Sequence, residues 1–423
     1  MDLLTIITIL IIISAAFSYL NVRIVRLPGT IGVVTVSIAV SVLILTAGKA
    51  DSALAITFTD LAKNINFSKV LLDVMLGFLL FASALHFDYR KLREARAAVL
   101  ILSTLGVIVS TGLFAIVFYG AAHLLHIRIP LSYCLVFGAL ISPTDPIAVG
   151  AVLKNSRIPP KLHTIISGES LFNDAVGLIL FVIFLQIAGD PDAEVSFKAV
   201  LKLFELEVLG GVAIGLVAGY FGYRLIRSIQ DFQSIFLISI ALVLGISAAA
   251  HQVHASIPLA VVTAGLIIGN QTRDKRKLTN QFLNQVWHLI DEVLNTILFV
   301  LIGLQLIVIP FVSLYWHIGL ISIFIALAAR MASLVLPVAP VLRRVSFGNL
   351  YILTWAGLRG GISIAMALTL PPSRYKDLIL SSCYMIVIFS VVIQGLTLNK
   401  VIDKVAARRE KKRAPENKSS PAL

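Results

Sequence analysis

A short polar stretch interrupts a long apolar run, and its residue types could bind a cation or carry a proton. The stretch GESLFND places Glu169, Ser170, Asn173 and Asp174 within six residues. On a helix, side chains four positions apart share a face, which pairs Ser170 with Asp174 and Glu169 with Asn173. Carboxylate and hydroxyl oxygens are ligands that a hard cation prefers. The stretch is therefore a candidate ion-binding site.

A second polar stretch, GALISPTDPIAVG, precedes the first and contains two prolines. Pro143 and Pro146 bracket Thr144 and Asp145. Proline interrupts a helix and frees carbonyl oxygens that an intact helix would use. Non-helical backbone at membrane depth is tolerated only around a cavity or inside protein. We predict that this break lines a cation-attracting pocket, with Asp145 and Asp174 as its working carboxylates.

A third stretch, ILTWAGLRGGISIAMAL, places an arginine among helix breakers. The breakers are Gly357, Gly360 and Gly361. An unpaired ion in hydrocarbon is costly, so buried charges must pair, face water or become neutral. The economical pairing joins Arg359 to Glu169 as an ion pair that fixes one helix against another. No partner is assigned to Arg330, for which structural and functional roles are equally open.

Composition indicates that these stretches belong to a polytopic helical membrane protein. Of 423 residues, 58% are hydrophobic and 13% are charged, whereas soluble domains carry about 25% charged residues. Apolar runs of bilayer-spanning length, roughly 20 residues, recur along the chain. The net charge is +13. Because the basic residues lie between the apolar runs and in the C-terminal tail, we expect membrane lipids and no nucleic acid as partners.

The apolar runs predict thirteen spans and an all-α fold. Their expected ranges are 2–20, 30–47, 70–87, 97–125, 131–151, 162–188, 206–227, 232–250, 256–270, 284–308, 314–336, 349–370 and 378–399. The proline break falls in the fifth span and the glycine break in the twelfth. The two broken spans are seven positions apart, and this odd number gives them opposite orientations in the membrane. Such a pair is expected for two inverted six-helix repeats with discontinuous crossing helices and one helix between the repeats.

The distribution of Lys and Arg predicts the orientation. These residues are concentrated in alternate loops and in the tail 400–423. The asymmetry places the C-terminus in the cytoplasm and the N-terminus outside a cell membrane, either an inner or a plasma membrane. The tail is polar and basic, and we expect it to be disordered. It either binds anionic lipid or only enforces the topology.

The motifs SPTDPIAVGAVL, GESLFNDAVGLILF and GLRGGIS resemble the monovalent cation:proton antiporter superfamily, in its sodium/proton exchanger (NhaP/NHE-like) branch. The resemblance covers nearly the whole chain. It implies a homodimeric transporter without a cofactor, not an enzyme, that exchanges Na+ (or Li+ or K+) for H+ in an electroneutral, elevator-type cycle. Within a transmembrane domain 1–399, the implied parts are a core (97–188 and 314–399), a dimerisation scaffold (2–87 and 232–308) and a linker helix (206–227).

The resemblance also implies roles for single residues. Asp174 matches the essential aspartate that carries the ion and the proton. The positions that help to coordinate the cation match Thr144, Asp145 and Ser170. Asn173 marks the electroneutral branch, and Glu169 and Arg359 match the structural ion pair. One departure is Ala82 in LLFASALHFD, where a glutamate is common in the family, so any role of that acid is in doubt.

Other hypotheses remain open from the residues. Asp145 could only cap the second half-helix. A K+/H+ antiporter, a cation channel, an intramembrane aspartyl protease using Asp145 and Asp174, or a non-transporting sensor are alternative functions. The sequence shows no repeated filter element and no Gly-x-Gly-Asp signature at the acids. Asp291 and Glu292 open the tenth span, either as a solvated helix start or as the lining of a funnel. The histidines, among them His86, His163 and His288, either sense pH or are solvated.

Overall fold

The computed structural model describes residues 3–47, 60, 67–153, 156, 158–189, 197–273, 277–308, 315–336 and 347–413. In this part of the chain the regular elements are all helices. The N-terminal half contains α1 (Leu3–Leu20), η1 (Asn21–Val25), α2 (Gly29–Ala47), α4 (Phe67–Lys69), η2 (Val70–Met75), α5 (Leu76–His86), α6 (Tyr89–Ile101), η3 (Leu102–Gly106), α7 (Val107–Leu124), α8 (Leu131–Ile141), α9 (Pro146–Leu153) and α10 (Pro160–Gly189). Here η marks π-helical turns, which continue the neighbouring helices.

The C-terminal half is also helical. It contains α11 (Phe197–Ser228), α12 (Phe232–Gln252), α13 (Ile257–Arg273), α14 (Lys277–Val308), α15 (Trp316–Val335), α16 (Phe347–Trp355), α17 (Gly361–Thr369), α18 (Arg374–Ile388), η4 (Phe389–Gln394) and α19 (Gly395–Arg413). Among the described residues, nine helices are long and apolar enough to cross a membrane, and three further apolar helices are shorter. The all-helical, multi-pass architecture is confirmed, and the count of thirteen spans stays a prediction.

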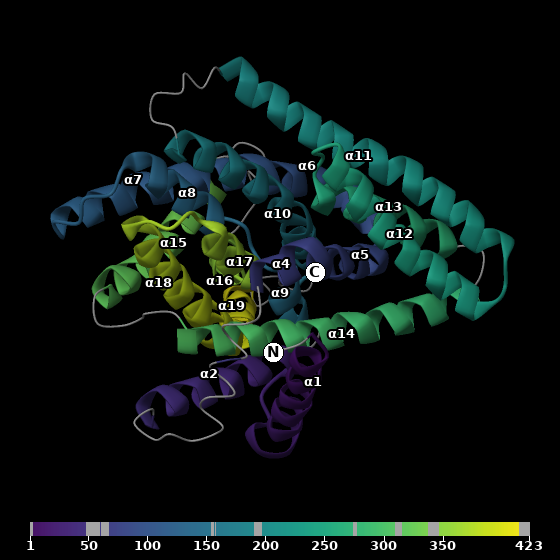
Figure 1. The fold of residues 1–423 in the computed structure, drawn as a ribbon, viewed down its shortest axis with the longest axis horizontal. Coiled ribbons are helices and arrows are strands. Elements are labelled where there is room, and N and C mark those ends of the chain that lie inside the picture. The colour runs from purple at the N-terminus through teal and green to yellow at the C-terminus, as the bar shows by residue number, and fades with distance from the viewer. Residues whose placement is uncertain are drawn as a thin grey trace, which may run out of the picture.

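The helices form two packed groups (Figure 1). In one group, α7, α8, α15, α17 and α18 pack around one another and against α10. In the other, α11 and α12 pack on α13, which in turn contacts α5. The long helix α14 contacts α2 as well as α5 and α17, so it runs along both groups.

Trp287 is the largest fully buried side chain at the junction of α14 with the second group. Its indole ring lies 4.7 Å from the ring of Phe81 on α5, measured between centroids. Its Nε1–H donates a hydrogen bond of 3.0 Å to Ser239 Oγ on α12. A buried Trp supplies large apolar area but needs a partner for its N–H. Trp287 therefore ties α14 to two neighbours at once.

Small residues allow α11 and α13 to lie close together. A Cβ on Gly215 of α11 would overlap the backbone carbonyl of Ala260 on α13. A Cβ on Gly219 would lie 2.8 Å from the Cα of Ala264, one turn further along. Glycine at such positions lets two helix backbones approach in a membrane, where burial from water does not drive helices together.

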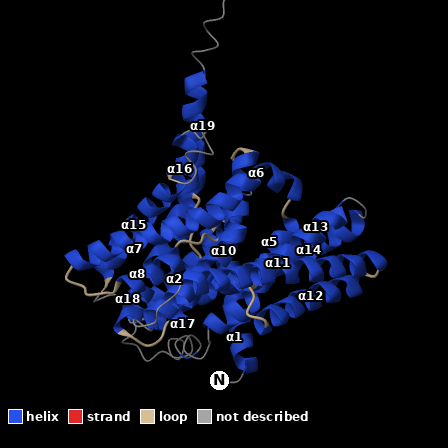
Figure 2. Cartoon of the chain, turned by 90° about the horizontal axis from the view of Figure 1, so that it is seen from above, coloured by secondary structure: helices blue, strands red, loops and turns tan. Residues whose placement is uncertain are grey.

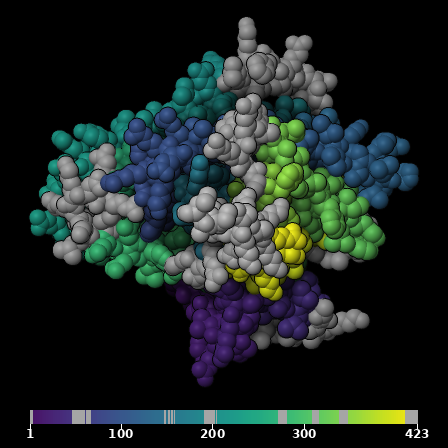
Figure 3. All heavy atoms as spheres, turned by 180° about the vertical axis from the view of Figure 1, so that it is seen from behind, coloured from purple at the N-terminus to yellow at the C-terminus, as the bar shows by residue number. Residues whose placement is uncertain are grey.

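The C-terminal tail differs from the prediction of disorder. Helix α19 continues to Arg413, and Figure 2 shows it rising out of the helical body. The segment KVAARREKKR is rich in Ala, Arg, Glu and Lys, which are among the best helix formers. Since it follows directly from a buried helix, it needs no new nucleus. Residues 414–423 lie outside the described residues. Seen from behind, the C-terminal part lies beside α1 and α2 (Figure 3).

Several helices are longer than the apolar runs suggest. Helix α11 begins at Phe197 and α14 at Lys277, although spans were expected from 206 and 284. The expected span 97–125 begins inside the basic helix α6, which starts at Tyr89 after the N-cap Asp88. Hydropathy marks only the stretch that suits a bilayer, whereas helices extend beyond it into polar surroundings.

Candidate functional site

The predicted break in the fifth span is present. Helix α8 ends at Ile141 and α9 begins at Pro146, which leaves 142–145 unwound. Pro143 lies inside this segment. Pro146 instead starts α9, at the position where the missing N–H of proline costs a helix least. The two prolines thus have different tasks: one interrupts, and the other begins the second half-helix.

The predicted break in the twelfth span is also present, and it meets the first. Helix α16 ends at Trp355, and α17 begins at Gly361 after the unwound segment 357–360. The backbone N–H of Asp145 donates to the carbonyl of Leu358 over 2.7 Å. Ser363 Oγ donates to the carbonyl of Leu140 over 2.6 Å. One hydrogen bond therefore joins the two unwound segments directly, and a second joins the half-helices α17 and α8 beside them.

The crossing is so close that side chains would not fit at two positions. A Cβ on Gly360 would fall on the carboxylate of Asp145. A Cβ on Gly177 of α10 would overlap the ring of Pro143. These glycines are thus required by the approach of the first break to its neighbours. Gly360 keeps the Asp145 carboxylate against the backbone of the second break.

Three polar side chains connect α10 to the first break. Thr144 Oγ1 and Ser170 Oγ lie 2.7 Å apart, within hydrogen-bond distance. Asn173 Nδ2 donates to the same Thr144 oxygen over 2.7 Å. All three side chains are at most 1% exposed. The structure thus brings together the hydroxyl and amide groups that the sequence grouped around Asp174.

Asp174 is buried beside this cluster with an unsatisfied oxygen. It is 3% exposed, and Asp145 is 6% exposed. Asp174 Oδ2 and Asn173 Oδ1 have no hydrogen-bond partner among the described residues. A buried polar atom without a partner is costly, so each such atom requires an explanation. Two acceptor oxygens left open at the helix crossing are suited to receiving a cation or, on the carboxylate, a proton.

The expected ion pair between Glu169 and Arg359 is wrong. Glu169 pairs instead with Arg330 of α15: Nη1 donates to Oε1, and Nη2 donates to Oε2 over 2.8 Å. Both side chains are at least 95% buried. This two-pronged geometry fits the planar guanidinium to the carboxylate. Arg330, to which the sequence assigned no partner, therefore fixes α15 against α10.

The side chain of Arg359 donates hydrogen bonds to backbone carbonyls of the first break. Its Nη1 donates to the carbonyls of Ser142 and, over 2.7 Å, of Pro143. Its own backbone N–H donates to Ser390 Oγ of η4 over 2.7 Å. The carbonyls are available because the helix is unwound there, and an arginine has enough donors to reach two of them. The guanidinium of Arg359, on the second break, thus occupies the carbonyl oxygens that unwinding frees on the first break.

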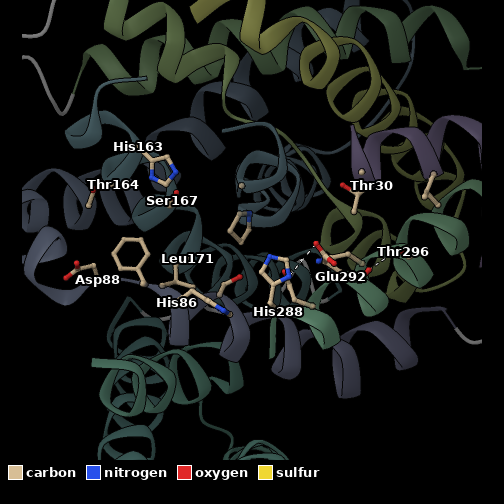
Figure 4. A pocket seen from close by; sticks show the side chains of 18 of the residues that line it. Thr30, His86, Asp88, His163, Thr164, Ser167, Leu171, His288, Glu292 and Thr296 are labelled. Atoms are coloured by element: carbon tan, nitrogen blue, oxygen red, sulfur yellow. Dashed lines mark hydrogen bonds and ion pairs between the residues drawn. The ribbon is translucent and has the colours of Figure 1, made fainter. Parts of the chain in front are cut away.

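A cavity of about 630 Å³ lies next to the site (Figure 4). Pro146 of α9 and Ser167 and Leu171 of α10 line it. Leu171 lies about one turn before Asp174 on α10, so the cavity lies one helical turn from that carboxylate along the helix. Its opposite wall comes from α2, α5 and α14.

Sequence analysis did not predict that three histidines share this cavity. His86, His163 and His288 come from α5, α10 and α14 (Figure 4). The rings of His86 and His288 lie 6.0 Å apart, and His288 Nδ1 lies 3.4 Å from Glu292 Oε1. Because they lie on separate helices, no local spacing indicates that they meet. Of the two proposed roles of Asp291 and Glu292, the structure favours lining a funnel, because both lie in the cavity wall.

Ala82, the departure from the family motif, is fully buried in α5. Its carbonyl lies 2.6 Å from His86 Nδ1, one turn further along the helix. The side chain at this position packs in the second group of helices. The chain thus has a methyl group at the position where the motif resemblance implied an acid, and the histidine uses only the backbone of this residue.

Comparison with known proteins agrees with this architecture. A family model described as sodium/hydrogen exchanger, transmembrane, matches residues 10–404. The Na(+)/H(+) antiporter NhaP of Pseudomonas aeruginosa is 38% identical over 418 residues, which cover 96% of this chain and 97% of that protein. The Na(+)/H(+) antiporter NhaH of Halobacillus dabanensis is 30% identical over 345 residues, covering 80% of this chain and 84% of that protein.

A solved structure shows the same fold. The sodium proton antiporter MjNhaP1 from Methanocaldococcus jannaschii at pH 8 superimposes with a TM-score of 0.75 at 16% identity, covering 96% of this chain and 99% of that chain. The resemblance based on the three motifs is confirmed. The protein is a multi-pass membrane transporter, not an enzyme, and it belongs to the sodium/hydrogen exchanger family.

Proposed function

We propose that this protein exchanges Na+ for H+, one for one, at Asp174. The observation that carries the proposal is the unsatisfied Asp174 oxygen, buried at the point where two broken helices cross. Names of the relatives support this activity, since both are Na(+)/H(+) antiporters. Li+ and K+ are alternative cargoes, because the residues alone do not distinguish among these ions.

The proposed cation site combines charged and neutral oxygens. Asp174 and Asp145 supply carboxylates, and Thr144 and Ser170 supply hydroxyls that already lie 2.7 Å from each other. Asn173 positions Thr144 through its amide and adds no charge. A bare buried carboxylate is unfavourable, so either a cation or a proton must neutralise Asp174. Competition between the two for one oxygen couples their movements in opposite directions.

The cavity supports an alternating-access cycle. It adjoins basic segments that the charge distribution places in the cytoplasm, so the proposed state is open to that side. In the proposed elevator, the core (97–188 and 314–399) moves against the scaffold (2–87 and 232–308), with 206–227 as linker. The scaffold forms a homodimer in this proposal. The cluster of α5, α11, α12 and α13 packs separately from the core helices and supports such a division, whereas α1, α2 and the end of α14 pack in the same cluster as the core.

Dye-loaded proteoliposomes with an imposed proton gradient test the proposal. Addition of Na+ should collapse the gradient with wild type, whereas Asp174→Asn should reduce the rate at least a hundredfold. Lowering the pH should raise the apparent KM for Na+, by up to about tenfold per pH unit, because protons then occupy the shared oxygen. If wild type gives no Na+ response, or if Asp174→Asn transports normally, the proposal is wrong.

Asp231→Asn is a matched control for the loss of one carboxylate. Asp231 caps α12 by accepting a hydrogen bond of 2.8 Å from the N–H of Ser234. Hydrogen bonds from Ser234 hold the pKa of this exposed carboxyl below its usual value, so it stays ionised across the assay range. Asparagine caps helices nearly as well as aspartate. Transport should therefore be unchanged.

Electrical recording separates the proposal from the channel hypothesis. An electroneutral exchanger should give no current under a Na+ gradient. A cation channel should give currents that follow the driving force and do not depend on a proton gradient.

A further inference from the structure

The cavity wall that faces α10 contains a second group of unsatisfied oxygens. Asp291 and Asn295 lie one turn apart on α14, and both line the cavity. Asn295 is 2% exposed, yet its Oδ1 has no hydrogen-bond partner in the described part of the chain, and neither has Asp291 Oδ1. The side chain of Asn295 is also a hydrogen-bond neighbour of the Asp291 carboxyl. One carboxylate and one amide oxygen thus remain open on the same helix face.

A third open oxygen comes from the neighbouring helix α2. Thr30 lines the cavity, and its Oγ1 has no partner among the residues that the structure describes. Ser37 and Ser41 of α2 donate to the carbonyls of Val300 and Gly303 of α14, which shows that the two helices run parallel in register.

This register places Thr30 at the level of the two α14 residues. Thr30 lies about two turns before Ser37, and a residue two turns before Val300 falls between Asp291 and Asn295. Three open oxygens of different chemistry therefore lie at one level of the cavity on two neighbouring helices: a carboxylate, an amide carbonyl and a hydroxyl.

The other carboxylates of the cavity are engaged. Glu292 lies 3.4 Å from His288 Nδ1. Asp88 caps α6 by accepting a hydrogen bond of 2.9 Å from the N–H of Arg90. Asp291 keeps one carboxylate oxygen open beside the neutral Asn295 side chain, with His288, Glu292 and Asp145 as its charged neighbours. Such a set suits a hard monovalent cation, which one carboxylate neutralises while neutral oxygens replace part of its water.

We propose that Asp291, Asn295 and Thr30 form a second cation-binding site, separate from the one at Asp174, where a monovalent cation is held on the α14–α2 wall. Binding at this site does not depend on the exchange reaction. The further role, holding the cation before it passes to Asp174, rests on the proposed function. Because α14 and α10 face each other across the cavity, the ion would cross from one wall to the other.

Transport kinetics test the role of the site. Asn295→Leu has nearly unchanged volume and charge but lacks the oxygen, so it separates coordination from simple attraction by a negative charge. We expect Asn295→Leu and Asp291→Asn to raise the apparent KM for Na+ about three- to tenfold, with little change in the maximal rate. Asp231→Asn, which removes a carboxylate outside the cavity, is the matched control and should change the KM less than twofold. An unchanged apparent KM in both Asn295→Leu and Asp291→Asn would show that the second site does not hold the cation on its way to Asp174.

Binding of 22Na+ to purified Asp174→Asn protein tests the site itself. This variant should keep weak, saturable binding, and Asp174→Asn/Asn295→Leu and Asp174→Asn/Thr30→Val should lose it. Absence of binding in Asp174→Asn, with a retained melting temperature, would refute the site. If wild type fails to exchange Na+ but Asp174→Asn still binds it, the proposed function falls while this site stands.

Discussion

The two helix breaks that cross at the centre of this protein differ in the charge they carry. The first, 142–145, contributes Asp145 and Thr144 next to α10. The second, 357–360, contributes Arg359, which donates to the carbonyls of the first. Unwinding a helix exposes both donors and acceptors. The guanidinium of Arg359 on the second break binds two carbonyl oxygens of the first break. The acidic and hydroxyl side chains of the first break belong to the candidate site.

This difference shows that an unwound helix is not by itself an ion site. The carbonyls of Ser142 and Pro143 are already occupied by Arg359. The open oxygens belong to Asp174 and Asn173 on the unbroken helix α10. The breaks therefore act mainly by letting the two chain segments approach closely where they cross. The side-chain oxygens without a hydrogen-bond partner come from the intact helix α10.

The largest expected effect tests which arginine is the partner of Glu169. Arg330→Gln should destabilise the protein by about 3–5 kcal/mol, because it leaves a buried carboxylate unpaired. Arg359→Gln should cost only about 1–3 kcal/mol, because it leaves neutral carbonyls with fewer donors. Melting temperatures in detergent should rank the two variants in that order.

A double-mutant cycle with Glu169→Gln provides the control for this ranking. The coupling of Glu169 with Arg330 should be several times that with Arg359, because only Arg330 contacts the carboxylate directly. A stronger coupling to Arg359 would restore the pairing expected from the sequence and contradict the geometry.

The next effect concerns the closeness of the two breaks. Gly360→Ala places a Cβ on the Asp145 carboxylate, so the breaks must separate. Such overpacking typically costs about 1–3 kcal/mol, and we expect at least a tenfold lower rate of Na+-driven proton movement. Gly245→Ala on α12 is the matched control, because its Cβ would meet nothing within 4 Å. Equal activity of the two variants would show that the crossing is looser than described.

The smallest effect concerns one hydrogen bond between α17 and α8, the half-helices that flank the breaks. Ser363→Ala removes the donor to the Leu140 carbonyl at the end of α8 and should lower stability by about 1 kcal/mol. Ser322→Ala is the control, since this buried hydroxyl bonds only the Ile318 carbonyl of its own helix α15. A larger loss in the control variant would mean that this contact does not hold the half-helices together.

Much of the candidate site could be predicted because its members are close in sequence. Ser170, Asn173 and Asp174 share one helix, and Thr144 and Asp145 share one break, so spacing alone grouped them. Proline and glycine predicted the breaks because their backbone chemistry acts locally.

The partner of Glu169 could not be predicted in the same way. Two arginines lie within apolar runs, and both satisfy the requirement that a buried acid be paired. Choosing Arg330 over Arg359 depends on how α15 packs against α10, which no local pattern encodes. The same limit applies to the cavity, where α2, α5, α10 and α14 contribute one or a few residues each.

The sequence by itself determined that this chain is a bundle of membrane helices, interrupted twice and carrying acids where hydrocarbon is expected. Hydropathy, helix breakers and charge act within a few turns of the chain, so they can be recognised without coordinates. Only the tertiary structure decided which buried charges touch, which carbonyls an arginine occupies and which oxygens stay open. Those choices depend on packing between helices that are distant in sequence, where an ångström of approach separates a hydrogen bond from an unsatisfied group.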